Sequence, residues 1–263
     1  MSCIITRTRG VYTKNGRPAS DADQTRAKKL GIPPAYTDVC VFGPNAKLQA
    51  TAMDATGKKH YYYHERFKKA RRAKRKKRAE TLDFKRIRTH TASILARPTH
   101  ASHDDALALR MIALCYMRPG GTSVRPTGSY GALSLQREHV KLGPGKRVRF
   151  TYRAKSGVTR QCDVTDGFLH DALKRSIRKR NARLTGKATR DGVTQLLRRI
   201  HGATSDLQIK DIRTAGAMKL FNDASSRSTD QDAVKQTAKM LGHNPSTCKK
   251  YYILNKNLVK KIR

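Results

Sequence analysis

A histidine and a tyrosine near the end of the chain have residue types and a spacing that could break a phosphodiester. His243 follows Gly242, a residue type that ends helices, and Tyr252 comes nine residues later. A tyrosine can attack phosphorus, and the phenoxide can leave again, so the covalent bond is reversible. The adjacent Tyr251 is an alternative nucleophile, but the spacing from His243 favours Tyr252.

Cleaving a DNA strand in this way requires two further kinds of side chain. Negative charge grows on the non-bridging oxygens, and arginine guanidinium groups match phosphate oxygens bidentately. A proton must also reach the departing 5′ oxygen, which is a task for a lysine or a histidine. The candidates are Arg118 at the end of an apolar helix, Arg213 at the start of another helix, and Lys155 at the tip of a hairpin.

Three of these assignments have an alternative. Arg125 is an alternative to Arg118, and His243 by itself could be only a cation at the C-terminus of a helix. The alternatives to Lys155 are Lys146, Arg153 and Arg160.

The charge of the chain indicates what these groups act on. The 263 residues contain 57 Lys and Arg against 19 Asp and Glu, a formal net charge of +38. A charge of this size indicates a polyanionic partner, with nucleic acid as the first choice, and says nothing of the fold. A basic structural or packaging protein is the less specific alternative.

Cysteine usage and hydropathy indicate a protein that works inside the cell. The five cysteines are scattered and have no zinc-ligand spacing, so we expect them to be reduced. No apolar run approaches roughly 20 residues, and the N-terminus lacks a signal-peptide pattern, so we expect no membrane association.

The elements that must position these groups differ between the two ends of the chain. Residues 1–65 are rich in strand patterns, and a Gly-containing turn at 54–57 predicts a hairpin. Residues 66–78 contain ten cations in thirteen positions and predict a linker that would fold against phosphates. From residue 79 onward helices dominate. The expected strands are 39–42, 48–53, 59–64, 131–135, 147–152 and 158–164, and the expected helices are 104–117, 166–181, 190–201, 209–223 and 230–241.

Several blocks of sequence, in order along nearly the whole chain, resemble type IB DNA topoisomerases, nearest to the small poxvirus and bacterial-type enzymes. The final block runs from Gly242 to Tyr252. Two blocks depart from the family pattern, with His60 in place of Gln and Ala154 in place of Gly. The other blocks are 28–39, 57–63, 118–120, 131–135, 154–157 and 210–214.

The resemblance implies a role for each candidate. Tyr252 would attack duplex DNA and form a 3′-phosphotyrosyl bond, while Arg118, Arg213 and His243 would hold the non-bridging oxygens. Lys155 would be the general acid, with Arg118 as an alternative that shares this role. Swivelling and religation would relax supercoils without ATP, metal or any other cofactor.

The resemblance also implies an α+β fold with two lobes. A β-rich domain (1–65) and the basic linker (66–78) would close a clamp on duplex DNA, and the mainly helical residues 79–263, with a small β-hairpin region, would form the catalytic domain. We expect a monomer, located wherever the DNA is: nucleus, nucleoid, viral factory or virion. The residues expected to contact DNA are Lys58, Lys59, Tyr61, Tyr63, Arg66, Lys68, Lys69, Arg71 and Arg72.

Two rival functions remain at this point. A tyrosine recombinase or integrase uses a similar set of side chains, but the second arginine block here begins with Lys210, where recombinases usually have His. The β-rich N-terminal part also differs from the helical core-binding domain of recombinases. A non-catalytic basic DNA-binding protein would share the charge and would not need Tyr252.

Overall fold

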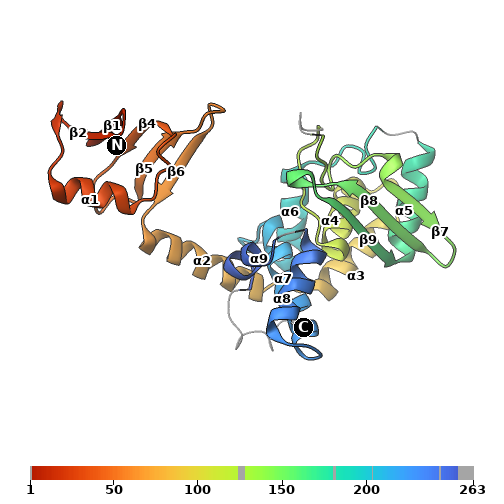
Figure 1. The fold of residues 1–263 in the computed structure, drawn as a ribbon. Helices are drawn as coiled ribbons and strands as arrows, with labels where there is room; N and C mark the ends of the chain where they lie inside the picture. Colours follow the sequence, from red (N-terminus) through yellow and green to blue (C-terminus); the bar gives the residue numbers. More distant parts are fainter. Residues whose placement is uncertain (1, 124–127, 180–181, 203, 243, 254–263) are drawn as a thin grey trace. The chain divides into compact units, whose positions relative to one another are not determined.

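The computed structural model describes residues 2–123, 128–179, 182–202, 204–242 and 244–253. The chain forms two compact units, Met1–Lys74 and Arg75–Arg263 (Figure 1). The division falls within helix α2 (Glu65–Glu80), and each unit is described here by itself. Within the described residues, no helix combines the length and the apolar character that crossing a membrane requires.

The first unit is an antiparallel sheet with one helix against it (Figure 1). Its strands are β1 (Ile5–Thr8), β2 (Val11–Lys14), β3 (Arg17–Pro18), β4 (Thr37–Val41), β5 (Leu48–Met53) and β6 (Lys59–Tyr63). They lie in the order β3-β2-β1-β4-β5-β6. Alternate residues such as Ile5, Val41 and Ala50 form its core together with Ala27 of helix α1 (Asp21–Lys29).

The expected hairpin at 54–57 is present between β5 and β6. The carboxylate of Asp54 accepts hydrogen bonds from the backbone amides of Thr56 and Lys58, which closes the turn. Hydrogen bonds from His60 and Thr56 hold the pKa of the Asp54 carboxyl well below its usual value. The turn is therefore fixed by the chain's own polar groups, and the strand that carries Tyr61 is held in register.

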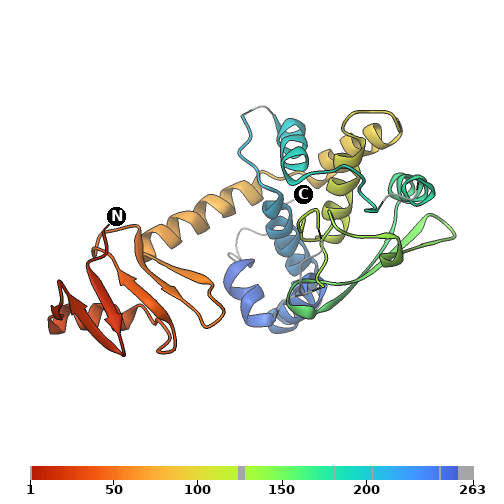
Figure 2. The same cartoon turned by 90° about the horizontal axis from the view of Figure 1, so that it is seen from above.

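The second unit is built around helix α4, which contacts helices on several sides and also strand β9 (Figures 1 and 2). Nine of the thirteen residues of α4 are buried, because apolar side chains occur all round it. The helices of this unit are α3 (Phe84–Leu95), α4 (His103–Cys115), α5 (Gly167–Arg178), α6 (Arg190–His201), α7 (Ile209–Ser225), α8 (Asp230–Leu241) and α9 (Pro245–Tyr251).

A three-stranded antiparallel sheet packs against this helical core. Its strands are β7 (Val140–Gly143), β8 (Arg147–Arg153) and β9 (Thr159–Thr165), with β8 in the centre. Residues along β8 alternate, so that Val148, Phe150 and Tyr152 are buried and the residues between them are exposed. The α+β class predicted from the sequence is confirmed.

Two expectations were wrong. Residues 131–135 form a turn and no strand, because all five are buried and Gly131 lies against the backbone of Gly120. The cysteines were expected to be reduced, but four of them form the pairs Cys3–Cys40 and Cys115–Cys162. Strand β1 pairs with β4, and β9 packs against α4, which brings the Cα atoms to 5.5 and 5.9 Å, within disulfide range.

The pair Cys115–Cys162 gives a prediction for stability. Cys162→Ala should lower the free energy of unfolding by about 2–4 kcal/mol, because a closed loop of this length constrains the unfolded chain. Urea denaturation without reductant measures this loss, and with dithiothreitol the two proteins should be nearly equal. An equal loss under both conditions, or no cross-linked peptide in a non-reducing digest, would contradict the pairing.

The contact between α7 and the end of α4 gives a second prediction. A β-carbon at Gly216 would overlap the ring of Tyr116. Gly216→Ala should therefore cost about 1–3 kcal/mol of stability, although alanine favours a helix interior by about 1 kcal/mol over glycine. The matched control is Gly167→Ala, where the nearest atom, Cγ of Lys146, would be 3.9 Å away. Thermal denaturation compares them, and a stabilising Gly216→Ala would show the packing to be wrong.

Candidate active site

Four of the five catalytic candidates line one cavity in the second unit. The cavity has a volume of about 370 Å³, and its walls include Arg118, Lys155, Arg213 and Tyr252. These residues come from four separate segments of the chain, so only the fold brings them together. The fifth candidate, His243, lies outside the described residues.

A left-handed turn at the end of α4 directs Arg118 to this cavity. Tyr116 caps the helix with φ of 49°. The loop that follows is then held by two backbone hydrogen bonds, from Ala132 to the carbonyl of Arg118 at 2.9 Å and from Leu133 to that of Pro119 at 2.8 Å. The buried turn at 131–135 thus supports the arginine loop, which explains why both blocks occur together in the sequence.

Arg213 reaches the cavity from a buried position on α7. It is only 4% exposed, and its guanidinium donates to the carbonyl of Tyr116 at 2.5 Å and to that of Leu241. Burial, with the cations Arg160 and Arg118 close by, lowers the pKa of Arg213 to about 10. The group therefore remains charged at neutral pH, in a place where water screens its charge poorly.

The start of α7 is fixed by a buried ion pair. Asp211 is fully buried and accepts hydrogen bonds from Arg78 at 2.7 Å and from the backbone of Gln208 at 2.9 Å. It lies in the first turn of the helix, where a carboxylate is favoured by the helix dipole. This pair holds the turn that contains Arg213, two residues later.

Tyr252 follows α9, which begins at Pro245 with Asn244 as its N-cap. It is partly buried and packs against a small cluster that contains Leu241 and Cys248. Its ring lies 5.9 Å from the guanidinium carbon of Arg213. The ring is thus beside a buried cation.

The alternative nucleophile, Tyr251, lies elsewhere. It is 47% exposed and is not among the residues that line the cavity. Its neighbour on α9, Lys250, lies over its ring, and both side chains face solvent.

Lys155 lies at the tip between β8 and β9, in a short 3-10 turn where Ser156 adopts φ of 68°. The three alternatives to Lys155 do not line the cavity. Lys146 pairs with Asp171 at 2.8 Å, beyond the other end of β8. Arg160 is buried, and Arg153 lies against Gly157. Arg125, the alternative to Arg118, lies outside the described residues.

The cavity also contains groups that the sequence did not single out. Arg190 and Lys210 add two cations, and Tyr130 adds an aromatic wall. Arg75, the first residue of this unit, has its guanidinium carbon 5.9 Å from the centre of the Tyr252 ring and donates to the carbonyl of Tyr251. Among the described residues that line the cavity there is no carboxylate, so its charge is positive.

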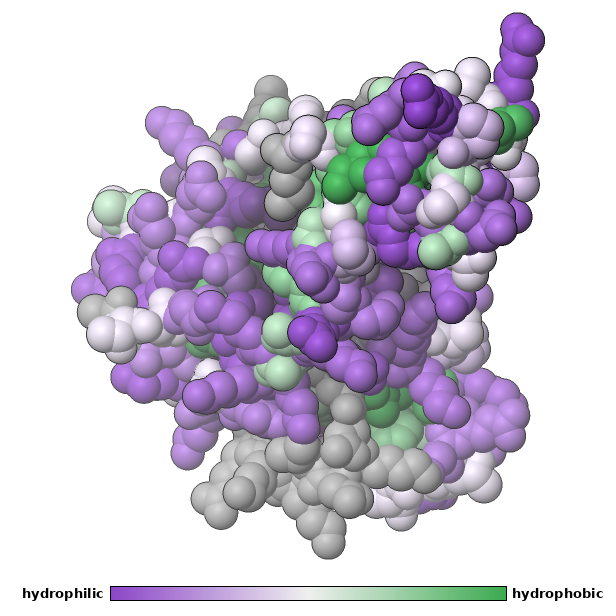
Figure 3. Space-filling model, turned by 90° about the vertical axis from the view of Figure 1, so that its left-hand side faces the viewer, coloured by the Kyte–Doolittle hydropathy of each residue, from purple (hydrophilic) through white to green (hydrophobic). Residues whose placement is uncertain are grey.

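The residues expected to contact DNA in the first unit are mostly exposed. Tyr61 is 54% exposed, whereas Tyr62 faces the sheet core, as the alternation of a strand requires. Tyr63 packs against Phe67 at 5.2 Å between ring centres. Hydrophilic side chains cover most of the face drawn in Figure 3. The exposed cations of this set are Lys58, Lys59, Arg66, Lys68, Lys69, Arg71 and Arg72.

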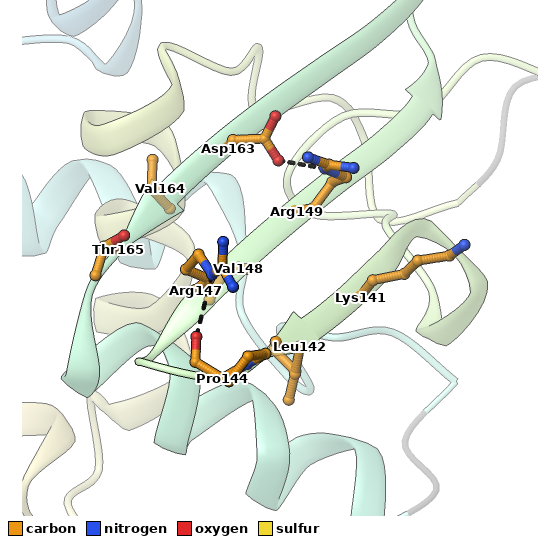
Figure 4. Close-up of a pocket in the computed structure, with 10 residues that line it drawn as sticks. Lys141, Leu142, Pro144, Arg147, Val148, Arg149, Asp163, Val164 and Thr165 are labelled. Atoms are coloured by element: carbon orange, nitrogen blue, oxygen red, sulfur yellow. Dashed lines mark hydrogen bonds and ion pairs between the residues drawn. The ribbon is translucent and has the colours of Figure 1, made fainter.

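A larger cavity of about 510 Å³ lies on the β7–β8–β9 sheet (Figure 4). None of the candidates lines it. Two of its three cations are engaged locally, since Arg149 pairs with Asp163 at 2.5 Å and Arg147 donates to the carbonyl of Pro144 at 3.2 Å. The positive charge there is partly neutralised, which distinguishes it from the cavity that contains Tyr252.

Comparison with known proteins agrees with this arrangement. Residues 57–262 match the catalytic core of eukaryotic DNA topoisomerase I, and residues 11–54 match the N-terminal domain of bacterial DNA topoisomerase IB. The DNA topoisomerase 1B of Acanthamoeba polyphaga mimivirus is 28% identical, over 94% of this chain and 82% of that protein.

Solved structures with a similar fold include the XerH site-specific recombinase in two complexes with difH. The post-cleavage complex matches with a TM-score of 0.48 and 16% identity over 68% of this chain, and the pre-cleavage complex with 0.47 and 15%. The chain spans about half the length of those recombinase chains, 51% and 52%. The match to the catalytic core covers most of the sequence, and the chain belongs to the type IB DNA topoisomerase family.

Proposed function

We propose that this protein relaxes supercoiled duplex DNA by cutting one strand through a covalent tyrosine intermediate and rejoining it. The observation that carries the proposal is the shared cavity of Arg118, Lys155, Arg213 and Tyr252. A nucleophile, two guanidinium groups and an ammonium group lie around a space large enough for a phosphate. This is the set that attack at phosphorus requires.

In the proposed reaction the Tyr252 hydroxyl releases its proton to solvent, its oxygen bonds to the scissile phosphorus, and the bond from phosphorus to the 5′ oxygen breaks. Arg118 and Arg213 stabilise the charge on the non-bridging oxygens, and His243 joins them by the family resemblance. Lys155 gives its proton to the 5′ oxygen. The adduct is a 3′-phosphotyrosine, and the free 5′ hydroxyl reverses each step after the strand has swivelled.

The proposed chemistry needs neither ATP nor a divalent metal. The phosphodiester energy is kept in the adduct, because one ester replaces another. The cations that a metal would otherwise supply come from the side chains around the cavity, and the described lining residues include no carboxylate to hold Mg²⁺.

The partner in this proposal is duplex DNA, held by a monomer as a clamp and located wherever that DNA is. Residues 1–65 and the basic segment 66–78 would supply backbone contacts, and residues 79–263 the chemistry. Exposed cations on α2 suit phosphates, and the exposed Tyr61 suits a groove or a sugar. Such contacts fix position and carry little sequence information.

Replacing the nucleophile tests the proposal most directly. Tyr252→Phe should lower the rate of plasmid relaxation by at least about 1,000-fold, because no other group can form the ester. Tyr251→Phe is the matched control and should relax plasmid at the normal rate. Trapping the adduct and mapping the modified residue and the DNA end gives an independent readout. Relaxation that survives in Tyr252→Phe would overturn the proposal.

Chelation provides a second test. In EDTA and without nucleotide, the unmodified protein should remove both positive and negative supercoils from any plasmid circle. Agarose gels of topoisomers taken over time measure the rate. A rate that disappears with EDTA and returns with Mg²⁺ would contradict charge stabilisation by side chains alone. Activity that required paired recombination sites would favour a recombinase instead.

A further inference from the structure

An arginine occupies a core position in the hairpin that carries Lys155. Along β9 the alternation places Arg160 on the face that packs inward, and its partner across the strand pair is Tyr152. Arg160 is 7% exposed and Tyr152 is 4% exposed. A charged side chain in such a position is costly unless its donors are satisfied.

Three backbone carbonyls satisfy this guanidinium. It donates to Cys115 at 3.2 Å, to Tyr116 at 3.4 Å and to Met240 at 2.5 Å. The first two carbonyls belong to the end of α4 and the third to the end of α8. The last carbonyls of a helix lack partners within the helix and carry partial negative charge. Arg160 therefore binds two helix C-termini at once.

Arg213, which lies on α7, binds the ends of the same two helices, α4 and α8. It donates to the carbonyls of Tyr116 and Leu241. The carbonyl of Tyr116 is thus shared by a residue of the cavity wall and by Arg160, which the cavity does not include. A displacement of either guanidinium would move the carbonyl that positions the other.

The aliphatic stem of Arg160 has a separate contact. A β-carbon at Gly242 would lie 3.1 Å from its Cδ atom, so the stem packs directly against the C-cap of α8. The next residue in the sequence is His243. The Arg160 side chain therefore contacts the end of α4 and the end of α8. Tyr116 at the first of these ends is two residues before Arg118, and Met240 at the second is three residues before His243.

We infer that Arg160 is a positioning residue for strand cleavage, which fixes the arginine loop after α4 and the end of α8 relative to the hairpin that carries Lys155. The inference rests on the proposed function. Lysine would not replace it, because a compact ammonium cannot reproduce the planar fork that spans two helix ends. The expected effect is on the chemical step, since Arg160 is buried and cannot reach DNA.

The test uses the full chain and a short duplex that carries a mapped cleavage site. Arg160→Lys keeps the charge and should slow single-turnover cleavage by about 10- to 100-fold, because small displacements of catalytic groups have effects of this size. Binding of uncleaved DNA, measured in the Tyr252→Phe background with and without Arg160→Lys, should be unchanged. A slower cleavage rate with unchanged DNA affinity is not expected of a residue that only stabilises the fold.

Arg110→Lys is the matched control. Arg110 is also buried, at 4% exposure, and it too makes several hydrogen bonds, to the carbonyl of Arg88, to Thr91 and to Asp166. It does not line the cavity. Arg110→Lys should reduce thermal stability and leave the cleavage rate of the folded protein near normal. Melting curves give the folded fraction by which both rates are corrected.

The outcomes separate the inference from the proposed function. If the unmodified chain forms no adduct, both fail. If it does, and Arg160→Lys cleaves within twofold of normal, or slows no more than Arg110→Lys, only the positioning role is overturned. Should Arg160→Lys not fold, Arg160→Gln replaces it. Failure of both to fold, while Arg110→Lys folds, would assign Arg160 to the fold and overturn the inference.

Discussion

The carbonyl oxygen of Tyr116 is the point on which the geometry of the candidate active site depends. The left-handed conformation of this residue ends α4 and exposes the carbonyl to two guanidinium groups, those of Arg160 and Arg213. Two cations of like charge repel, and this repulsion contributes to the lowered pKa of Arg213. Dipoles at the helix ends offset part of the repulsion, and a bound phosphate would offset more.

The partners of the buried arginines differ with their place in the second unit. Two arginines that do not line the cavity, the buried Arg110 and the partly buried Arg78, pair with Asp166 and Asp211, each at 2.7 Å, so their charge cancels. Near the cavity, the hydrogen bonds described above for Arg160 and Arg213 end on neutral carbonyls. A carbonyl satisfies a donor and leaves the net charge in place. Positive charge therefore remains where the proposed reaction develops negative charge, in a region of weak screening.

Sequence patterns were sufficient where a residue's environment follows from its neighbours in the chain. Periodicity located the last four long helices within a few residues, and alternation separated Tyr61 from Tyr62. The chemistry of the residue types, together with the resemblance of ordered sequence blocks to type IB topoisomerases, gave the four residues that line the cavity. Each of those residues ends an element or lies at its start, and these are positions that turn and cap residues mark in a sequence.

The remaining features depend on contacts between distant segments. The sequence of residues 131–135 predicts a strand, although in the structure these residues are buried on every side and form a turn. The close approach of Gly120 to Gly131, which the sequence does not show, determines the backbone conformation of this turn. The cysteine pairs join segments that are 37 and 47 residues apart in the sequence. In the structure the alternation of β9 places Arg160 on the core face, and the carbonyls that make this tolerable come from α4 and α8. A charged residue at a core position of a strand is the signal that could have identified it.

The chain's cations divide into two physical classes, and the division bears on how the proposed enzyme would work. Exposed side chains such as Lys58 and Arg66 would interact with phosphates across water, and salt would largely screen these interactions beyond about 8–10 Å. These exposed cations would determine the affinity of the protein for DNA and the rate at which it binds DNA. Arg213 is buried, and its interaction with a phosphate in the cavity is screened much less. In the proposed enzyme, affinity and the chemical step would therefore depend on separate sets of charges: the surface cations would bind any duplex, and a few fixed groups would determine the rate of cleavage.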